Sequence, residues 1–322
     1  MTTLNRREFV ASMAGVSALG LSGSLAFLPS TALAAARDKG YYKYKVGSDI
    51  EIISIYDGVW NKPHDETFIK GVSVEQTKES LRNAGMNDEA IPIEFAFTVI
   101  KTPGETILVD AGTGGQLAPS AGLGSKGMAA AGISAADIDK IIISHMHPDH
   151  IFGLMEKETN AQLFPNAEIM VGETEYGFWT QDGLIEKLPE RRKGLAKRIQ
   201  ATFPTWKNVT QFSNGTEVAS GVTAVDSFGH TPGHTSFRIS SGDQQLMLIG
   251  DALLLPALFL TNLDWQIAFD SDADQATATR KGIVQEAVAD GISLAGYHFG
   301  FPNSGTIEKD GNGFVFNPHS VG

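Results

Sequence analysis

An apolar run that ends in a cluster of histidines constrains the fold of this chain more than any other feature. The stretch KIIISHMHPDHIFGLM, residues 140–155, carries four candidate metal ligands: His145, His147, Asp149 and His150. Its β-branched residues predict a strand over 140–146. Alternate residues of a strand point the same way, so His145 and His147 are expected to face one point. Pro148 ends the strand, and the other two ligands follow in the turn. Imidazole nitrogens combined with a carboxylate suit zinc or a similar transition metal.

Three further candidates stand where later apolar strands end. His234 follows a Thr-Pro-Gly turn in GHTPGHTSF, Asp251 ends LMLIGD, and His298 ends SLAGYH. Strand ends of this kind are where α/β proteins place their chemistry. The assignment is His145, His147 and His234 to a first metal, Asp149, His150 and His298 to a second, and Asp251 to both as a bridge. Positions left open on both ions predict a catalytic site, with a bridging hydroxide as the nucleophile.

The composition narrows the classes of function. Cysteine is absent, so disulfides, thiolate zinc sites and cysteine nucleophiles are excluded. The formal net charge of -12 disfavours nucleic acid as a partner and leaves a small-molecule substrate as the expectation. The one dense basic stretch, ERRKGLAKR at 190–198, is interpreted as a solvated helix face because its charges alternate with apolar positions at helical spacing.

The first 34 residues resemble a twin-arginine export signal. Arg6 and Arg7 precede an apolar segment diluted by glycine and serine, and Ala-Leu-Ala follows at 32–34. The serines and glycines argue against the alternative of a membrane anchor, so cleavage near Ala34 is expected, with no stable membrane insertion afterwards. A periplasmic or secreted location follows, and export in the folded state would allow metal to be loaded in the cytoplasm.

The remaining part, residues 35–322, is predicted to be one α/β domain. Apolar and β-branched runs predict strands over 51–58, 94–102, 105–112, 140–146, 168–173, 222–229, 236–241, 244–251 and 292–298, and a hairpin over 306–316. Helical spacing predicts helices over 74–84, 134–139, 173–180, 187–201 and 273–289. The Gly-, Ala- and Ser-rich segment 113–132 is expected to be a loop with one short helical turn that borders the site.

The motifs HMHPDH, GHTPGH, IGD and GYH occur in the order seen in metallo-β-lactamase-fold hydrolases, and the resemblance spans residues 40–318. It implies a four-layer αββα sandwich with two metals at one edge of the sheets, zinc being the expected ion. Asp110 in LVDAG matches a family aspartate that supports the metal-binding loops through hydrogen bonds. His230 is expected to support the ligands rather than bind metal, because His234 takes the ligand position. The resemblance also suggests a homodimer.

Within this family the stretches GYYKYKVGSDIEIISIYDG and LFPNAEI resemble those of the methyl parathion hydrolases. That similarity implies hydrolysis of an organophosphate triester, an ester or a lactone. Asp149 or Asp251 would handle the proton, and the sequence does not choose between them. Phe178 and Trp179 are candidates for an apolar wall of the substrate pocket, with core packing as the alternative.

Departures from these relatives leave other activities open. Methyl parathion hydrolase has a pocket phenylalanine where this chain reads GTGGQLAPS, with Leu117 the nearest apolar candidate. Quorum-quenching lactonases carry a tyrosine where this chain has Leu254, which weakens that alternative without removing it. A mononuclear iron oxidoreductase of the same fold would not need the complete second ligand set.

Overall fold

The computed structural model describes the backbone of residues 30–319 and the side chains of residues 35–319. Most of the predicted export signal, residues 1–34, lies outside this described part, and residues 30–34 begin helix α1 (Ser30–Lys39). Within residues 30–319, no helix is both long and apolar enough to cross a membrane.

The first of two large sheets holds seven strands from residues 41–212. Its order is β1 (Tyr41–Val46), β2 (Ile50–Lys62), β4 (Ile91–Lys101), β5 (Thr106–Val109), β6 (Lys140–Ile143), β7 (Glu168–Gly172) and β8 (Val209–Phe212). The strands from β1 to β5 pair antiparallel, and those from β5 to β8 pair parallel. The parallel part therefore ends at one common edge, where the loops after β5 and β6 lie next to each other.

The second large sheet holds strands from the carboxyl-terminal half. Its order is β16 (Gly313–Pro318), β15 (Ser304–Asp310), β14 (Ser293–Gly296), β12 (Gln244–Gly250), β11 (Thr235–Ser241), β10 (Val222–Asp226) and β9 (Glu217–Ala219). Only β12 and β14 pair parallel among these strands. Two short strands, β3 (Ile69–Lys70) and β13 (Gln266–Ile267), form a separate pair.

The apolar runs of the central strands are buried on both faces, which is why these strands lack a polar alternation. Ile52 and Ile142 of the first sheet pack against Phe237 and Leu248 of the second in the layer between the sheets. Ile53, the next residue along β2, belongs to the outer layer that packs against helices. The successive residues of one strand thus fill two different cores.

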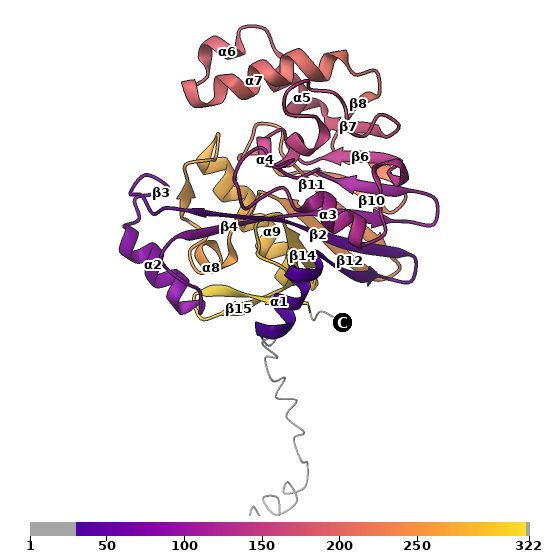
Figure 1. Cartoon of the computed structure of the whole chain (residues 1–322). Coiled ribbons are helices and arrows are strands. Elements are labelled where there is room, and N and C mark those ends of the chain that lie inside the picture. Colours follow the sequence, from indigo (N-terminus) through magenta and orange to yellow (C-terminus); the bar gives the residue numbers. More distant parts are fainter. Residues whose placement is uncertain (1–29, 320–322) are drawn as a thin grey trace, which may run out of the picture.

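Helices cover the outer faces of both sheets (Figure 1). Besides α1 they are α2 (Val74–Asn83), α3 (Gly124–Ala130), α4 (Pro148–Ile151), α5 (Glu173–Thr180), α6 (Leu184–Lys187), α7 (Glu190–Thr202), α8 (Pro256–Phe259) and α9 (Ala273–Asp290). Single 3-10 turns cover Ala135–Asp137, Phe152–Leu154 and Phe203–Thr205. The order helix, sheet, sheet, helix is the predicted αββα sandwich.

Several predicted elements have different limits in the structure, and two of these differences affect the site. The strand predicted over 140–146 ends at Ile143, because the next amide, that of Ser144, donates to Asp110 Oδ1 at 2.8 Å instead of continuing the sheet. His145 and His147 therefore lie on a loop. The helix predicted over 187–201 is α7, which begins only at Glu190 because Pro189 precedes it as the N-cap, and the separate helix α6 ends at Lys187.

Candidate metal centre

The candidate ligands meet at the edge of the sandwich where β6, β12 and β14 end. The first sheet contributes His145 and His147 from the loop after β6, and Asp149 and His150 from α4. The second sheet contributes Asp251 directly after β12, His298 after β14, and His230 from the turn between β10 and β11. Each of these side chains thus follows a strand that is held in place by its packing in the core of the sandwich.

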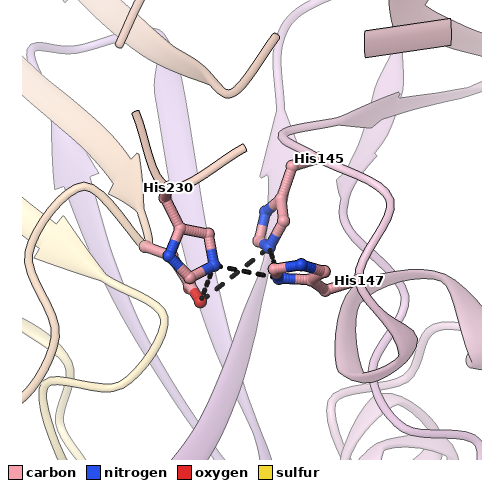
Figure 2. A group of neighbouring side chains, drawn as sticks. His145, His147 and His230 are labelled. Atoms are coloured by element: carbon pink, nitrogen blue, oxygen red, sulfur yellow. Dashed lines mark hydrogen bonds and ion pairs between the residues drawn. The ribbon is translucent and has the colours of Figure 1, made fainter. Parts of the chain in front are cut away.

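The first group consists of His145, His147, His230 and Asp251, whose ligand atoms all lie within 4.8 Å of one another. Nδ1 of His147 lies 3.0 Å from Nε2 of His145 and 2.9 Å from Nε2 of His230. His230 Nε2 in turn lies 3.2 Å from Asp251 Oδ2. Figure 2 shows the three imidazole rings pointing toward one another from two different segments of the chain.

The second group consists of Asp149, His150, Asp251 and His298, again with all ligand atoms within 4.8 Å of one another. Nε2 of His298 lies 3.3 Å from both Asp149 Oδ2 and Asp251 Oδ2. Nε2 of His150 lies 3.2 Å from Asp251 Oδ1. Asp251 belongs to both groups, the position assigned to it from the sequence.

The donor atoms of the two groups fit divalent metal ions. His150 Nε2 and Asp251 Oδ1 are buried 3.2 Å apart without the geometry of a hydrogen bond, and neither has another hydrogen-bond partner among the described residues. Such atoms are costly to bury unless something binds them. Burial, followed by the charge of neighbouring histidines, lowers the pKa of His145 well below its ordinary value, so this ring is neutral and can donate a lone pair.

The carboxylates supply the charge that a cation would balance. Burial alone would lower the pKa of His298, but Asp251 and Asp149 raise it to about 10. Burial likewise opposes the effect of Asp251 and Asp270 on His230, and the carboxylates raise the pKa of that ring to about 9. These shifts show an excess of negative charge at the ligand atoms, which is the environment that divalent ions require.

Asp110 supports the metal-binding loop. Its Oδ1 accepts from the amide of Ser144, and its Oδ2 lies 2.8 Å from both Ser144 Oγ and His150 Nδ1. Asp110 adopts a φ of 59°, a left-handed conformation that turns its side chain back toward this loop. The contact with Nδ1 directs Nε2 of His150 toward the other ligands.

Glu175, which sequence reasoning did not single out, joins the two histidine loops. Its Oε1 accepts from Met146 N at 2.9 Å and from Trp179 Nε1 at 2.7 Å. Its Oε2 accepts from Thr231 Oγ1 at 2.7 Å and from Gly233 N at 3.1 Å. One fully buried carboxylate thus fixes Met146, between His145 and His147, relative to the turn that carries His230. A glutamate in the first turn of a helix gave no signal of this role.

The assignment of His234 to the first metal is wrong, and His230 lies in its place. His234 Nε2 accepts from the amide of Asp251 at 3.0 Å, so its Nδ1–H donates to Ser227 Oγ at 2.7 Å. Both ring nitrogens are therefore used within the protein. Burial lowers the pKa of His234 to about 3, in keeping with a neutral ring that fixes the loop of Asp251.

A cavity of about 350 Å3 opens onto both groups. Its polar floor includes His147, Asp149, His230, Asp251 and His298. Its apolar wall consists of Trp60, Ile93, Phe95, Leu117, Ala118, Pro148, Leu195 and Phe269. Leu117, the apolar candidate named from the sequence, thus lines the cavity.

The predicted pocket residues Phe178 and Trp179 do not line this cavity. Trp179 is fully buried, because α5 turns its indole toward the core, where Nε1 donates to Glu175. Phe178 packs against the same core. Their role is the alternative considered for them, core packing.

The interpretation of 190–198 as only a solvated face is also wrong. Arg191, Arg192 and Leu195 line the cavity, so this side of α7 faces the site. Arg198 one turn later donates to Gln116 Oε1 at 2.8 Å and so ties the helix to the loop that carries Leu117.

A profile of the metallo-β-lactamase superfamily matches residues 96–288, which carry six of the seven residues of the two groups. The chain belongs to the metallo-β-lactamase superfamily. This membership confirms the predicted fold and the predicted class of metal-dependent hydrolase. A search of curated proteins found none with significant sequence similarity to this chain.

Several solved structures share the superfamily fold with this chain. One is AidC, a dizinc quorum-quenching lactonase solved with a product, at 28% identity and a TM-score of 0.81 over 87% of this chain and 98% of that one. Another is the hydrolase AbOPH of the beta lactamase superfamily, at 23% identity and a TM-score of 0.80 over the same shares, 87% and 98%. A probable metal-dependent hydrolase from Staphylococcus aureus follows at 21% identity and a TM-score of 0.67, over 80% of this chain and 91% of that one.

Proposed function

We propose that this protein hydrolyses a small, largely apolar ester or lactone at a centre that holds two divalent metal ions, zinc being the ion to test first. The observation that carries the proposal is that both ligand groups open into one mainly apolar cavity of about 350 Å3. A cavity of this size and lining suits a small organic molecule.

The ligand atoms are arranged for catalysis rather than for a closed structural site. Five of the seven residues in the two groups line the cavity, so ions bound there would keep positions open toward a substrate. Two divalent ions would supply Lewis-acid activation of water and of the oxygen at the scissile bond. The chain contributes the carboxylates that move the proton and the walls that exclude bulk water.

Asp149 is the residue that we propose as the proton acceptor. Its side chain is 17% exposed, against 4% for Asp251. Burial would raise the pKa of Asp149, but His150 and His298 lower it, so the carboxylate is ionised. Tyr297 donates from its hydroxyl to the backbone oxygen of Asp149 at 2.5 Å and holds this residue in position.

A lactone is the first substrate to test because AidC, at 28% identity, is a lactonase of the same fold. The similarity of GYYKYKVGSDIEIISIYDG to the methyl parathion hydrolases makes an organophosphate triester the second. Phe178 and Trp179, which were predicted to form an apolar wall for the leaving group, are not among the residues that line the cavity, and this weakens the case for the triester.

The test compares initial rates on an aliphatic lactone, an aryl ester and an aryl phosphotriester, before and after chelation. We expect lactone or ester hydrolysis that chelation abolishes and added zinc restores. The variant Asp251→Asn removes charge from a carboxylate shared by both groups and is expected to lower metal content and activity together. Undiminished hydrolysis in metal-free protein would disprove the proposal, and preference for the triester would reassign the substrate.

A further inference from the structure

Two adjacent arginines line the cavity that holds the candidate metal centre. Arg191 and Arg192 stand in the first turn of α7, and Leu195 of the next turn joins them in the wall. The rest of the wall is apolar, apart from the residues of the two ligand groups. The guanidinium groups are therefore the polar feature of this cavity that the proposed hydrolysis does not use.

Neither arginine has an acidic partner among residues 35–319. Arg192 donates to the backbone oxygen of Phe269 at 2.7 Å and to Ser271 Oγ at 3.1 Å, and Arg191 makes a single long contact with Ala268 O at 3.4 Å. These acceptors are neutral. The neighbouring Lys193, in contrast, pairs with Glu190 at 3.0 Å.

The unpaired charge is notable in a chain that has 37 acidic residues and 25 basic ones. Burial, followed by the positive charge of Arg191, lowers the pKa of Arg192, and the opposing charge of Asp270, which forms no ion pair with Arg192, does not offset this shift. A half-buried cation beside a second cation is unfavourable unless an anion binds there. A guanidinium offers paired N–H donors that match the two oxygens of a carboxylate.

We infer that Arg191 and Arg192 bind a carboxylate that is separate from the scissile group, so that the preferred substrate is an ester or lactone carrying a free carboxylate on its acyl chain. This inference rests on the proposed function, because it names the class of substrate for the same cavity. The apolar wall then contacts the carbon chain between the two polar ends.

The test uses two matched esters with acyl chains of equal length, 4-nitrophenyl hexanoate and mono-4-nitrophenyl adipate. Both are assayed with the zinc-loaded full chain, and spontaneous hydrolysis is subtracted. We expect kcat/KM for the adipate ester to exceed that for the hexanoate by about tenfold or more, because a charge-assisted hydrogen bond gives a preference of this order.

Arg191→Gln is the informative variant, since Arg191 is exposed and makes only the long contact with Ala268. The ratio of the two kcat/KM values is expected to fall about tenfold, chiefly through KM for the adipate ester. Arg192→Lys keeps the charge but not the paired donors, and a smaller fall is expected. Lys197→Gln removes one exposed positive charge from the same helix away from the cavity and should leave the ratio unchanged.

Hydrolysis of the hexanoate ester without a preference for the adipate would overturn the inference and leave the proposed function intact. An unchanged ratio in Arg191→Gln would overturn it as well. If a lactone were hydrolysed but neither ester was, the proposed function would stand, and ligand binding would test the inference in place of the rates. If no lactone and no ester were hydrolysed, the proposed function would fail, and the same binding measurement would still test the inference. Adipic monoanilide should then bind the wild type at least about tenfold more tightly than it binds Arg191→Gln by calorimetry. Equal affinity of adipic monoanilide for the wild type and for Arg191→Gln would show that its carboxylate does not bind at Arg191 and would overturn the inference.

Discussion

Asp270 Oδ1 lies 3.0 Å from Nδ1 of His230, and both side chains are almost completely buried. This contact fixes the tautomer and orientation of the imidazole, so that Nε2 faces His147 and Asp251. The second oxygen of Asp270 has no hydrogen-bond partner among the described residues, which leaves the full carboxylate charge beside the ring.

Asp270→Asn is expected to weaken metal binding by about 10- to 100-fold, the usual effect of losing a carboxylate behind a histidine ligand. The physical reason is that a neutral amide neither raises the basicity of His230 nor selects one tautomer. Competition with a fluorescent zinc chelator measures the change. Asp264→Asn serves as the control, because Asp264 is exposed and pairs only with Lys281. Equal affinity in the two variants would contradict the role of Asp270.

His230→Ala and His234→Ala separate the two histidines of the GHTPGH turn. His230→Ala is expected to reduce the metal content from about two ions per chain to about one, because it removes a donor atom from the first group. His234→Ala removes the ring acceptor of the Asp251 amide and the ring donor to Ser227 Oγ, so the free energy of unfolding should fall by about 1–3 kcal/mol. Elemental analysis and urea unfolding give the two readouts. Loss of an ion only in His234→Ala would restore the assignment made from the sequence.

Glu175→Gln places an amide where four donors converge on a carboxylate. The NH2 group of glutamine has to face at least one of these donors, and the free energy of unfolding is expected to fall by about 1–3 kcal/mol. Metal affinity should fall with it, because the two histidine loops lose their common anchor. Glu173→Gln is the matched control in the same helical turn, where the side chain is exposed. Similar stability of both variants in urea would argue against this anchor.

His319 should make the stability of the domain depend on pH. Nε2 and Nδ1 of its ring lie 3.2 Å from Ser293 Oγ and 3.3 Å from Ser304 Oγ, and burial lowers the pKa of the ring below its ordinary value of 6.5. The unfolded chain then binds the proton more readily, so the stabilisation is complete above about pH 6.5 and is lost as the pH falls toward the folded-state pKa. The free energy of unfolding of the wild type should therefore decline more steeply below about pH 6.5 than that of His319→Asn. Parallel curves for the two zinc-loaded proteins would show that His319 does not contribute.

The motif after β6 was predictable because its information is local. His145, His147, Asp149 and His150 all lie within seven residues of the end of one apolar strand, and a proline follows the first two. Their shared position at this strand end can therefore be read from the local sequence. The core strands were predictable for a similar reason, since their continuous apolar runs leave no polar face.

The incorrect site predictions concern residues whose roles depend on contacts with distant parts of the chain. The motif GHTPGH contains two histidines in similar local contexts. Hydrogen bonds to Ser227 and to the amide of Asp251 occupy both ring nitrogens of His234, and the sequence of the motif does not reveal these bonds. The helical spacing of Trp179 and of Arg191 shows that one face differs from the other, but not whether that face meets a core, a cavity or solvent. Glu175 gave no signal because its four donors come from three separate segments of the chain.

Helix α7 supplies Arg191, Arg192 and Leu195 to the cavity but contains none of the residues of the two ligand groups. The helix lies between β7 and β8, whereas the ligands follow β6, β10, β12 and β14. Substitutions within residues 190–202 can therefore change which molecules fit the cavity while every residue of the two ligand groups stays in place, so selection can act on substrate choice and on metal binding separately.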